Sequence, residues 1–214
     1  MLIVLAGTIG AGKSSLAKAL GAHLGTEVFY EAVDHNPVLD LYYENPKKYA
    51  FLLQIYFLNK RFESIKMAYR RDNNVLDRSI FEDELFLKLN YKNGNVTKTE
   101  LDIYKDLLGN MLEELEGMPK KRPDLLVFID VSFETMLSRI EKRGRAFEQI
   151  KTQPGLREYY HQVYHEYPEW YEKYNVSPKI KIDGDQIDFV NNPSDLKNVL
   201  DQIDQQLKTL DLLH

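Results

Sequence analysis

The sequence predicts an α/β fold in which a five-stranded parallel sheet carries helices on both faces. Three observations lead to this prediction. Five short runs rich in apolar and β-branched residues recur along the 214 residues, and segments with helical periodicity separate them. The first run leads directly into a glycine-rich loop, and a helix follows that loop. Strands that alternate with helices in this way are typical of parallel sheets.

The composition is that of an ordinary globular domain. Of the residues, 43% are apolar and 29% charged, which disfavours disordered and fibrous classes and suits a single domain over 1–214. The absence of cysteine excludes disulfides, thiolate metal sites and a cysteine nucleophile. The net charge of −5 disfavours nucleic acid as a partner.

No apolar stretch approaches the roughly 18 to 20 residues that a membrane helix needs. The apolar opening at 1–6 is also too short for the core of a signal peptide. We therefore expect no membrane partner and a cytoplasmic location.

The first elements are predicted from short, clear patterns. Residues 2–6 read as a buried strand, 14–24 as an amphipathic helix, and 27–30 as a short second strand ending near Glu31. The fourth element is a long helix, because Asn45 and Pro46 are a helix cap followed by a favourable first residue.

That long helix is expected to run to about Arg71, and its segment 51–58 is apolar nearly all round, so it should be buried. A third strand follows at 75–76, a helix at 99–115 and a fourth, fully buried strand at 125–131. The remaining predicted elements are helices at 135–143, 156–174 and 193–210 and a fifth strand at 179–182.

The loop after the first strand matches the phosphate-binding pattern Gly-x-x-x-x-Gly-Lys-Ser/Thr. In such a loop the backbone N–H groups surround phosphates, so we expect Lys13 to reach the β- and γ-phosphates and Ser14 to ligate Mg²⁺. A plain glycine turn is the alternative, but the flanking strand and helix are what a phosphate loop requires. The predicted contacts to ATP from this loop are Gly7, Thr8, Ile9, Gly10, Ala11, Gly12, Lys13, Ser14 and Ser15.

Two other classes of phosphate-loop protein lack support. A GTPase needs Asn-Lys-x-Asp, yet the Asn59-Lys60 pair is followed by Arg61 and Phe62. A mechanical ATPase needs a Glu after the aspartate that closes its apolar strand, yet Val131 follows Asp130. A small-molecule kinase with the P-loop kinase fold remains the leading interpretation.

Charged residues end the second and third strands, at the edge where parallel sheets place their sites. Glu31 is a candidate base for an attacking hydroxyl, although a solvated strand-end glutamate is as good an interpretation of the sequence alone. If the third strand lies beside the first, Asp77 faces the Mg²⁺ and Arg78 points toward the transferring phosphoryl group. A surface ion pair is the alternative for these two residues.

With these residues in order, the chain resembles the deoxyribonucleoside kinase family, and it looks closest to the bacterial deoxyadenosine/deoxyguanosine kinases. The resemblance extends from the glycine loop to the fifth strand. Glu31 matches the catalytic glutamate, although the family's Glu-Pro is Glu31-Ala32 here. Asp77-Arg78-Ser79 replaces the family's Glu-Arg-Ser and keeps the carboxylate and the arginine.

The resemblance also implies substrate contacts. Gln54 corresponds to the glutamine that binds the base, Tyr43 to the tyrosine that binds the sugar, and Glu148 to the glutamate that binds the sugar 3′-hydroxyl. An arginine-rich lid at about 139–150 would contact the phosphates, through Arg139, Arg143 and Arg145. A solvated basic surface is the alternative for these arginines.

Gln54 and Arg61 are seven residues apart, so they share one face of an otherwise apolar helix. Buried polar groups need partners, and a nucleobase edge would satisfy Gln54, unless other protein groups do so. The resemblance pairs Arg61 with Asp83, which implies deoxyadenosine or deoxyguanosine as acceptor before thymidine. Phe86 is the expected stacking aromatic, although an ordinary core position suits it almost as well.

The predicted activity is therefore transfer of the ATP γ-phosphate to the 5′-hydroxyl of a deoxyribonucleoside. A nucleoside monophosphate kinase is the alternative enzyme, and a nucleotide-sensing regulator without turnover is the alternative outside enzymes. The resemblance implies a homodimer, or a heterodimer with a paralogous kinase subunit. The tyrosines of 156–174 suggest a packing face or a subunit contact.

Overall fold

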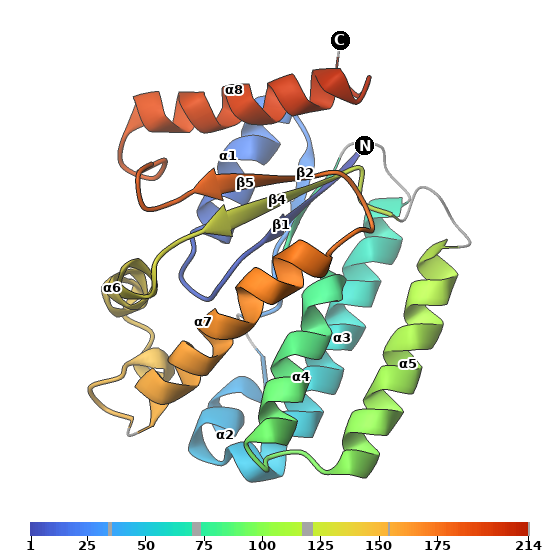
Figure 1. Ribbon diagram of the computed structural model, residues 1–214, viewed down its shortest axis with the longest axis vertical. Coiled ribbons are helices and arrows are strands. Elements are labelled where there is room, and N and C mark those ends of the chain that lie inside the picture. Colours follow the sequence, from blue (N-terminus) through green and yellow to red (C-terminus); the bar gives the residue numbers. More distant parts are fainter. Residues whose placement is uncertain (34–35, 70–73, 117–121, 154, 214) are drawn as a thin grey trace.

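The computed structural model describes residues 1–33, 36–69, 74–116, 122–153 and 155–213, and these form one parallel sheet with helices on both faces (Figure 1). The strands lie in the order β2-β3-β1-β4-β5. Their bounds are β1 Leu2–Ala6, β2 Glu27–Phe29, β3 Asn74–Asp77, β4 Leu125–Asp130 and β5 Lys179–Asp183. The predicted fold class is confirmed.

The register of the central strands brings the glycine loop next to the end of β3. Leu5 of β1 is opposite Asp77, the last residue of β3, and Ala6 is opposite Phe128 of β4. Since β1 continues directly into the loop at Gly7, the loop and Asp77 leave the sheet side by side. This edge carries the carboxyl ends of all five parallel strands.

The buried central strands contribute to two separate cores. Leu2, Val4 and Ala6 face one of them, with side chains from helices α3, α4, α5 and α7, and Ile3 and Leu5 face the other. Figure 1 shows α1 and α8 on one side of the sheet and α3, α4 and α5 on the opposite side. The helices are α1 Lys13–Leu24, α2 Leu39–Glu44, α3 Pro46–Tyr69, α4 Asp83–Lys92, α5 Lys98–Glu116, α6 Phe133–Arg143, α7 Leu156–Lys173 and α8 Pro193–Thr209.

The long helix α3 begins where the sequence predicts. The side chain of Asn45 accepts a hydrogen bond from the backbone N–H of Lys48 at 3.2 Å, as a helix cap does. The predicted end at Arg71 lies outside the described residues. α3 forms one wall of the large pocket described below.

Two helices were not predicted as elements. The six-residue α2 is too short to show a helical period, and α4 begins directly after the turn at the end of β3. The turn contains Ser79 and Glu82, which form a capping box at a 3-10 turn, Ile80–Glu82, that leads into α4. The Ser-x-x-Glu pattern was therefore a signal that predicts a helix start here.

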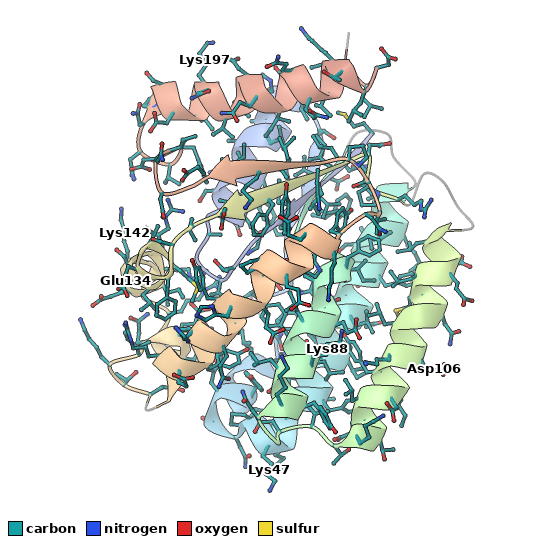
Figure 2. All side chains as sticks on the ribbon, in the orientation of Figure 1. Lys47, Lys88, Asp106, Glu134, Lys142 and Lys197 are labelled. Carbon is teal, nitrogen blue, oxygen red and sulfur yellow. The ribbon has the colours of Figure 1, made fainter. Side chains whose placement is uncertain are left out.

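The tyrosine-rich helix α7 packs against the sheet. Tyr160 and Tyr167 are buried, and the Tyr167 ring stacks on Phe128 of β4 with ring centres 6.1 Å apart. The predicted packing face is confirmed for these residues. Charged side chains elsewhere, such as Lys88 and Lys197, project outward from their helices (Figure 2). No helix of the described residues is long and apolar enough to span a membrane.

Gly21 allows α1 to approach the edge strand β2 closely. A Cβ added at Gly21 would lie 2.3 Å from Cγ2 of Val28. Alanine normally stabilises a helix interior relative to glycine by about 0.5–1 kcal/mol, but overpacking costs about 1–3 kcal/mol. We predict that Gly21→Ala lowers the free energy of unfolding by about 1 kcal/mol in urea titrations.

Gly109 in α5 is the matched control, because a Cβ there meets no atom of the described residues within 4 Å. Gly109→Ala should therefore raise the free energy of unfolding, and Val28→Ala should partly rescue Gly21→Ala. Stabilisation by both glycine substitutions would show that α1 and β2 are not in steric contact.

Candidate active site

A pocket of about 1040 Å³ opens at the carboxyl edge of the sheet. Its walls come from the glycine loop, the ends of β2 and β3, helix α3, and the segment that follows α6. Of the predicted site residues, those lining the pocket are Ile9, Gly10, Gly12, Lys13, Ser14, Ser15, Glu31, Tyr43, Gln54, Arg61, Asp77, Arg78, Phe86, Arg139, Arg143, Arg145 and Glu148. Gly7, Thr8, Ala11 and Asp83 lie behind this surface.

The glycine loop has the conformation that a phosphate loop needs. Gly7 has a φ of +144°, and a Cβ there would lie 2.7 Å from the carbonyl oxygen of Ile129. Gly12 caps α1 with a φ of +103° and offers no side chain to the first helical N–H groups. Those donors, together with the positive end of the helix, favour a bound anion at this position.

Lys13 is buried at the base of this loop. Its Nζ donates hydrogen bonds to the carbonyl oxygens of Gly7 and Thr8, both at 2.8 Å. Burial, with a further contribution from the positive charge of Arg78, lowers the pKa of Lys13 to about 8. The negative charge of a phosphate would raise this pKa again and so offset both burial and the charge of Arg78. The Lys13 ammonium therefore lies where a bound phosphate would stabilise its charged form.

Ser14 and Asp77 suit a magnesium ion. The Ser14 hydroxyl donates to Oδ2 of Asp77 at 2.5 Å, while Oδ1 of Asp77 is buried and has no hydrogen-bond partner among the residues that the structure describes. Burial raises the pKa of Asp77 above its ordinary value, and Lys13 opposes that shift. Oxygen ligands of this kind are what Mg²⁺ prefers, and they would meet it beside the phosphate loop. The residues present therefore fit the ion.

Glu31 is held between two buried arginines at the end of β2. Nε of Arg78 lies 2.8 Å from Oε1 of Glu31, and Nη2 of Arg61 donates to the same oxygen at 2.5 Å. Arg61 also forms an ion pair with the fully buried Asp83. Burial alone would raise the pKa of Glu31, but Arg78, Arg61 and Lys13 together lower it to about 2. Glu31 is therefore not a freely solvated strand-end residue.

Aromatic and amide side chains line the other end of the pocket. Gln54 is buried, and its side chain forms no hydrogen bond with any residue that the structure describes. The Phe86 ring lies 5.1 Å from the Arg78 guanidinium carbon, and Tyr43 stacks on Phe147 with ring centres 5.2 Å apart. Gln54 thus presents a donor and an acceptor beside aromatic faces, which suits a flat heterocycle.

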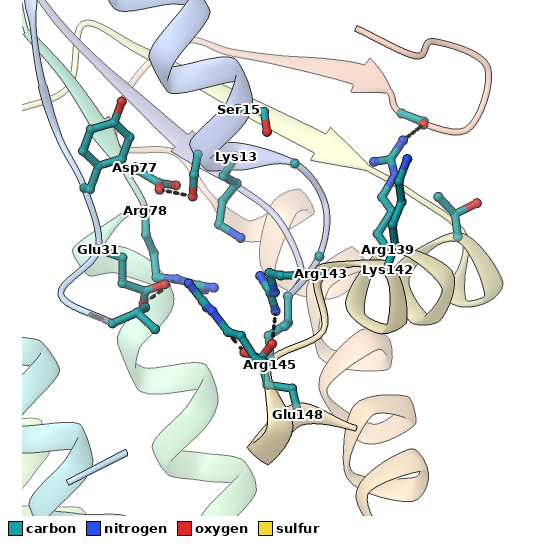
Figure 3. A pocket seen from close by; sticks show the side chains of 18 of the residues that line it. Lys13, Ser15, Glu31, Asp77, Arg78, Arg139, Lys142, Arg143, Arg145 and Glu148 are labelled. Carbon is teal, nitrogen blue, oxygen red and sulfur yellow. Dashed lines mark hydrogen bonds and ion pairs between the residues drawn. The ribbon is translucent and has the colours of Figure 1, made fainter. Parts of the chain in front are cut away.

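The predicted lid residues divide into two groups (Figure 3). Arg143 donates to Glu148 at 2.5 Å and Arg145 lies 3.6 Å from the same carboxylate, while the backbone carbonyl of Glu148 accepts from Tyr160. Arg139 instead donates to backbone carbonyls, to Ala11 at 2.8 Å and to Gly184 at 2.7 Å. Two arginines therefore surround Glu148, and the third braces the glycine loop.

Sequence reasoning missed two residues that contact this site from behind. Glu82 is fully buried and accepts a hydrogen bond from the backbone N–H of Gly7 at 3.3 Å. Tyr167 lies on α7 and accepts a hydrogen bond from Arg78 at 3.0 Å. The capping-box pattern was a signal for Glu82, whereas nothing in the local sequence distinguished Tyr167 from its neighbouring tyrosines.

The fold and the pocket together define a P-loop phosphotransferase. A scan against protein families matches the Deoxynucleoside kinase family over residues 3–208. The chain is 59% identical to a deoxyguanosine kinase of Lactobacillus johnsonii over 209 residues, which cover 98% of this chain and 93% of that protein. It is 54% identical to a deoxyadenosine kinase of Lactobacillus acidophilus over 209 residues, covering 98% and 97%.

Solved structures agree with these relatives. A deoxyadenosine kinase from M. mycoides with bound dATP is 32% identical, with a TM-score of 0.79, and the match covers 95% of this chain and 99% of that one. The chain therefore belongs to the deoxynucleoside kinase family. This membership favours a nucleoside kinase over the monophosphate kinase and the regulator that the sequence alone left open.

The depressed pKa of Glu31 predicts a pH-dependent contribution to stability. The shift from 4.5 to about 2 means that the charged form stabilises the fold above about pH 4.5, and that this contribution is lost as the pH falls toward 2. The full contribution is on the order of 3 kcal/mol. Urea titrations should show a large loss of stability in Glu31→Gln at pH 7 and a smaller one at pH 3.5.

Glu63 is the matched control, because its side chain is 52% exposed in a surface ion pair with Lys60. Glu63→Gln should change stability little at either pH. A difference between wild type and Glu31→Gln that stays constant from pH 7 to 3.5 would contradict the depressed pKa.

Proposed function

We propose that this kinase transfers the γ-phosphate of ATP to the 5′-hydroxyl of deoxyguanosine and deoxyadenosine, with Mg²⁺ as cofactor. The observation that carries the proposal is the Glu31–Arg61–Asp83 arrangement beside an unpaired Gln54 amide in one pocket with the glycine loop. Two close relatives carry the names of the two purine activities. We further propose a single domain over 1–214, a cytoplasmic location, and a homodimer or a heterodimer with a paralogous kinase subunit.

In this proposal the phosphate end of the pocket acts through Lys13, the loop N–H groups and the lid. Lys13 and the N–H groups of the loop bind the β- and γ-phosphates in place of the loop carbonyls that Lys13 now contacts. Ser14 and Asp77 would hold Mg²⁺, which neutralises charge on the phosphate oxygens. Arg143 and Arg145, which now contact Glu148, would bind the transferred group when the lid closes, and Arg139 would support the loop through its hydrogen bond to Ala11.

Glu31 would accept the proton of the 5′-hydroxyl. With a pKa of about 2 it is a weak base, so early removal of the proton is unfavourable. A loose phosphoryl-transfer transition state tolerates this, because the acceptor oxygen gains little bonding until late and its proton becomes acidic only then. The main contribution of Glu31 is then to orient the hydroxyl, and Arg78 fixes the carboxylate at 2.8 Å for that task.

The acceptor end would bind base and sugar separately. Gln54 is the bidentate partner for the base edge, with Phe86 stacking on its face. Tyr43 and Glu148 would hold the sugar hydroxyls, and burial raises the pKa of Tyr43 well above its ordinary value, so it remains a hydrogen-bond donor. Asp83 holds Arg61 in the same pocket wall and thereby limits the shape of the base that fits.

The first test is ATP-dependent phosphorylation of deoxyguanosine, deoxyadenosine, deoxycytidine, thymidine and their monophosphates. We expect turnover of the two deoxypurines, and a loss of at least about 100-fold in kcat for Glu31→Gln with ATP affinity retained. Activity confined to monophosphates would contradict the proposed acceptor. Binding of ATP without any turnover would contradict the enzyme itself.

The second test concerns the Arg61–Asp83 pair. Arg61→Met removes the guanidinium from the base end, so the ratio of kcat/KM for thymidine to kcat/KM for deoxyguanosine should rise about tenfold or more. The absolute rates should fall, because Arg61 also holds Glu31. Lys60→Met is the matched control on the exposed side of α3, and it should leave the ratio unchanged. An unchanged ratio in Arg61→Met would exclude this pair as a determinant of base choice.

A further inference from the structure

Arg78 has an unusual backbone conformation. Its φ is +108°, and Asp211 is the only other non-glycine residue with positive φ in the described ranges. A side chain at this φ is strained, and strained residues persist only where the surrounding structure holds them in place. Two buried groups, Glu82 and Tyr167, contact the Arg78 guanidinium.

Glu82 is the first of these groups. It is 0% exposed, and its carboxylate meets four donors from three parts of the fold. Oε2 accepts from the backbone N–H of Ser79 at 2.9 Å. Oε1 accepts from the hydroxyl of Tyr167 at 2.9 Å, from the N–H of Gly7 at 3.3 Å and from Nη1 of Arg78 at 3.4 Å. One carboxylate thus touches both the start of the phosphate loop and the end of β3.

Tyr167 is the second group. Its hydroxyl donates to Glu82 and accepts from Nη1 of Arg78 at 3.0 Å, so it bridges a long contact between the two charges. Burial, with the negative charge of Glu82, raises the pKa of Tyr167 well above its ordinary value. The hydroxyl therefore keeps its proton and its donor role. The ring is held against Phe128 of β4, which gives the hydroxyl a rigid support.

We propose that Glu82 and Tyr167 are positioning residues that fix the Arg78 guanidinium relative to the phosphate loop. The inference rests on the proposed function, in which Arg78 fixes the Glu31 carboxylate that orients the acceptor hydroxyl. Gly7 and Arg78 both donate to Oε1 of Glu82. One carboxylate therefore fixes the positions of the loop that would bind ATP and of the arginine beside Glu31. Such preorganisation speeds the chemical step without adding a contact to either substrate.

A purely structural role is the competing explanation, because Glu82 also closes the capping box before α4. A purely structural role predicts that substitutions at Glu82 or Tyr167 lower stability, and that their effect on kcat is the same whether residue 78 is arginine or lysine. Tyr167→Phe separates the two explanations better than a change at Glu82, because the ring and its packing remain. Tyr174→Phe is the matched control: Tyr174 is also buried at the end of α7, and its hydroxyl bonds to Ser177 at 2.8 Å.

The experiment is steady-state kinetics with deoxyguanosine and ATP, combined with a double-mutant cycle. We expect Tyr167→Phe to lower kcat roughly 10- to 100-fold, with KM for both substrates changed by less than about threefold. Tyr174→Phe should retain wild-type kinetics. In an Arg78→Lys background the lysine ammonium has no planar guanidinium for Tyr167 to position. Adding Tyr167→Phe to this background should therefore lower kcat by less than about threefold.

A readout independent of turnover is the exchange of the Arg78 Nε–H with water, followed by NMR in protein labelled with ¹⁵N-arginine. Exchange should be faster in Tyr167→Phe than in wild type or Tyr174→Phe. Unchanged exchange, an unchanged kcat, or an equal loss of kcat in both Arg78 backgrounds would overturn the positioning role. Faster exchange in a protein that phosphorylates no deoxynucleoside would support the positioning role and contradict the proposed function instead.

Discussion

A buried chain of alternating charges holds the site together, and the rest of the structure is arranged around it. The chain runs through Glu82, Arg78, Glu31, Arg61 and Asp83. An isolated charge in such a position would be very unfavourable, but here each charge has an opposite charge beside it. Its members come from α3, from the segment after β2, and from the turn and helix that follow β3. These charged residues meet because β2 and β3 are neighbours in the sheet and α3 contacts β3.

If the proposed roles hold, this arrangement couples the chemistry of phosphate transfer to the choice of acceptor. Arg61 contacts Glu31 on one side and Asp83 on the other. In the proposed function, the residue that limits which nucleobase fits therefore also helps to keep the Glu31 carboxylate charged. The two arginines make Glu31 a weak base and hold it tightly. A phosphoryl transfer with a loose transition state gains more from positioning than from basicity, so the two effects are compatible.

The pocket is lined by two chemically different groups of residues. The glycine loop, Lys13 and the pair Ser14–Asp77 line one part of the pocket and suit a phosphate and a cation. Gln54 and the aromatic rings form an amphipathic site in the other. Glu31 follows β2 and lines the same pocket with its ion-pair partners Arg78 and Arg61. A donor and an acceptor that bind at the two ends would therefore bring their reacting groups together next to Glu31 and Arg78.

The sequence by itself determined the features that depend on near neighbours in the chain. Strand runs, the glycine loop, the Asn45 cap of α3 and the shared face of Gln54 and Arg61 are all local patterns, and the structure contains each of them. The resemblance to a family added the order of the site residues. The tertiary structure alone decided which charges meet: Glu31 and Arg61 are 30 positions apart, and Arg78 and Tyr167 are 89 apart. Strand order and helix packing set those contacts, and no local pattern encodes them, so the roles of Glu82 and Tyr167 emerge only in the folded chain.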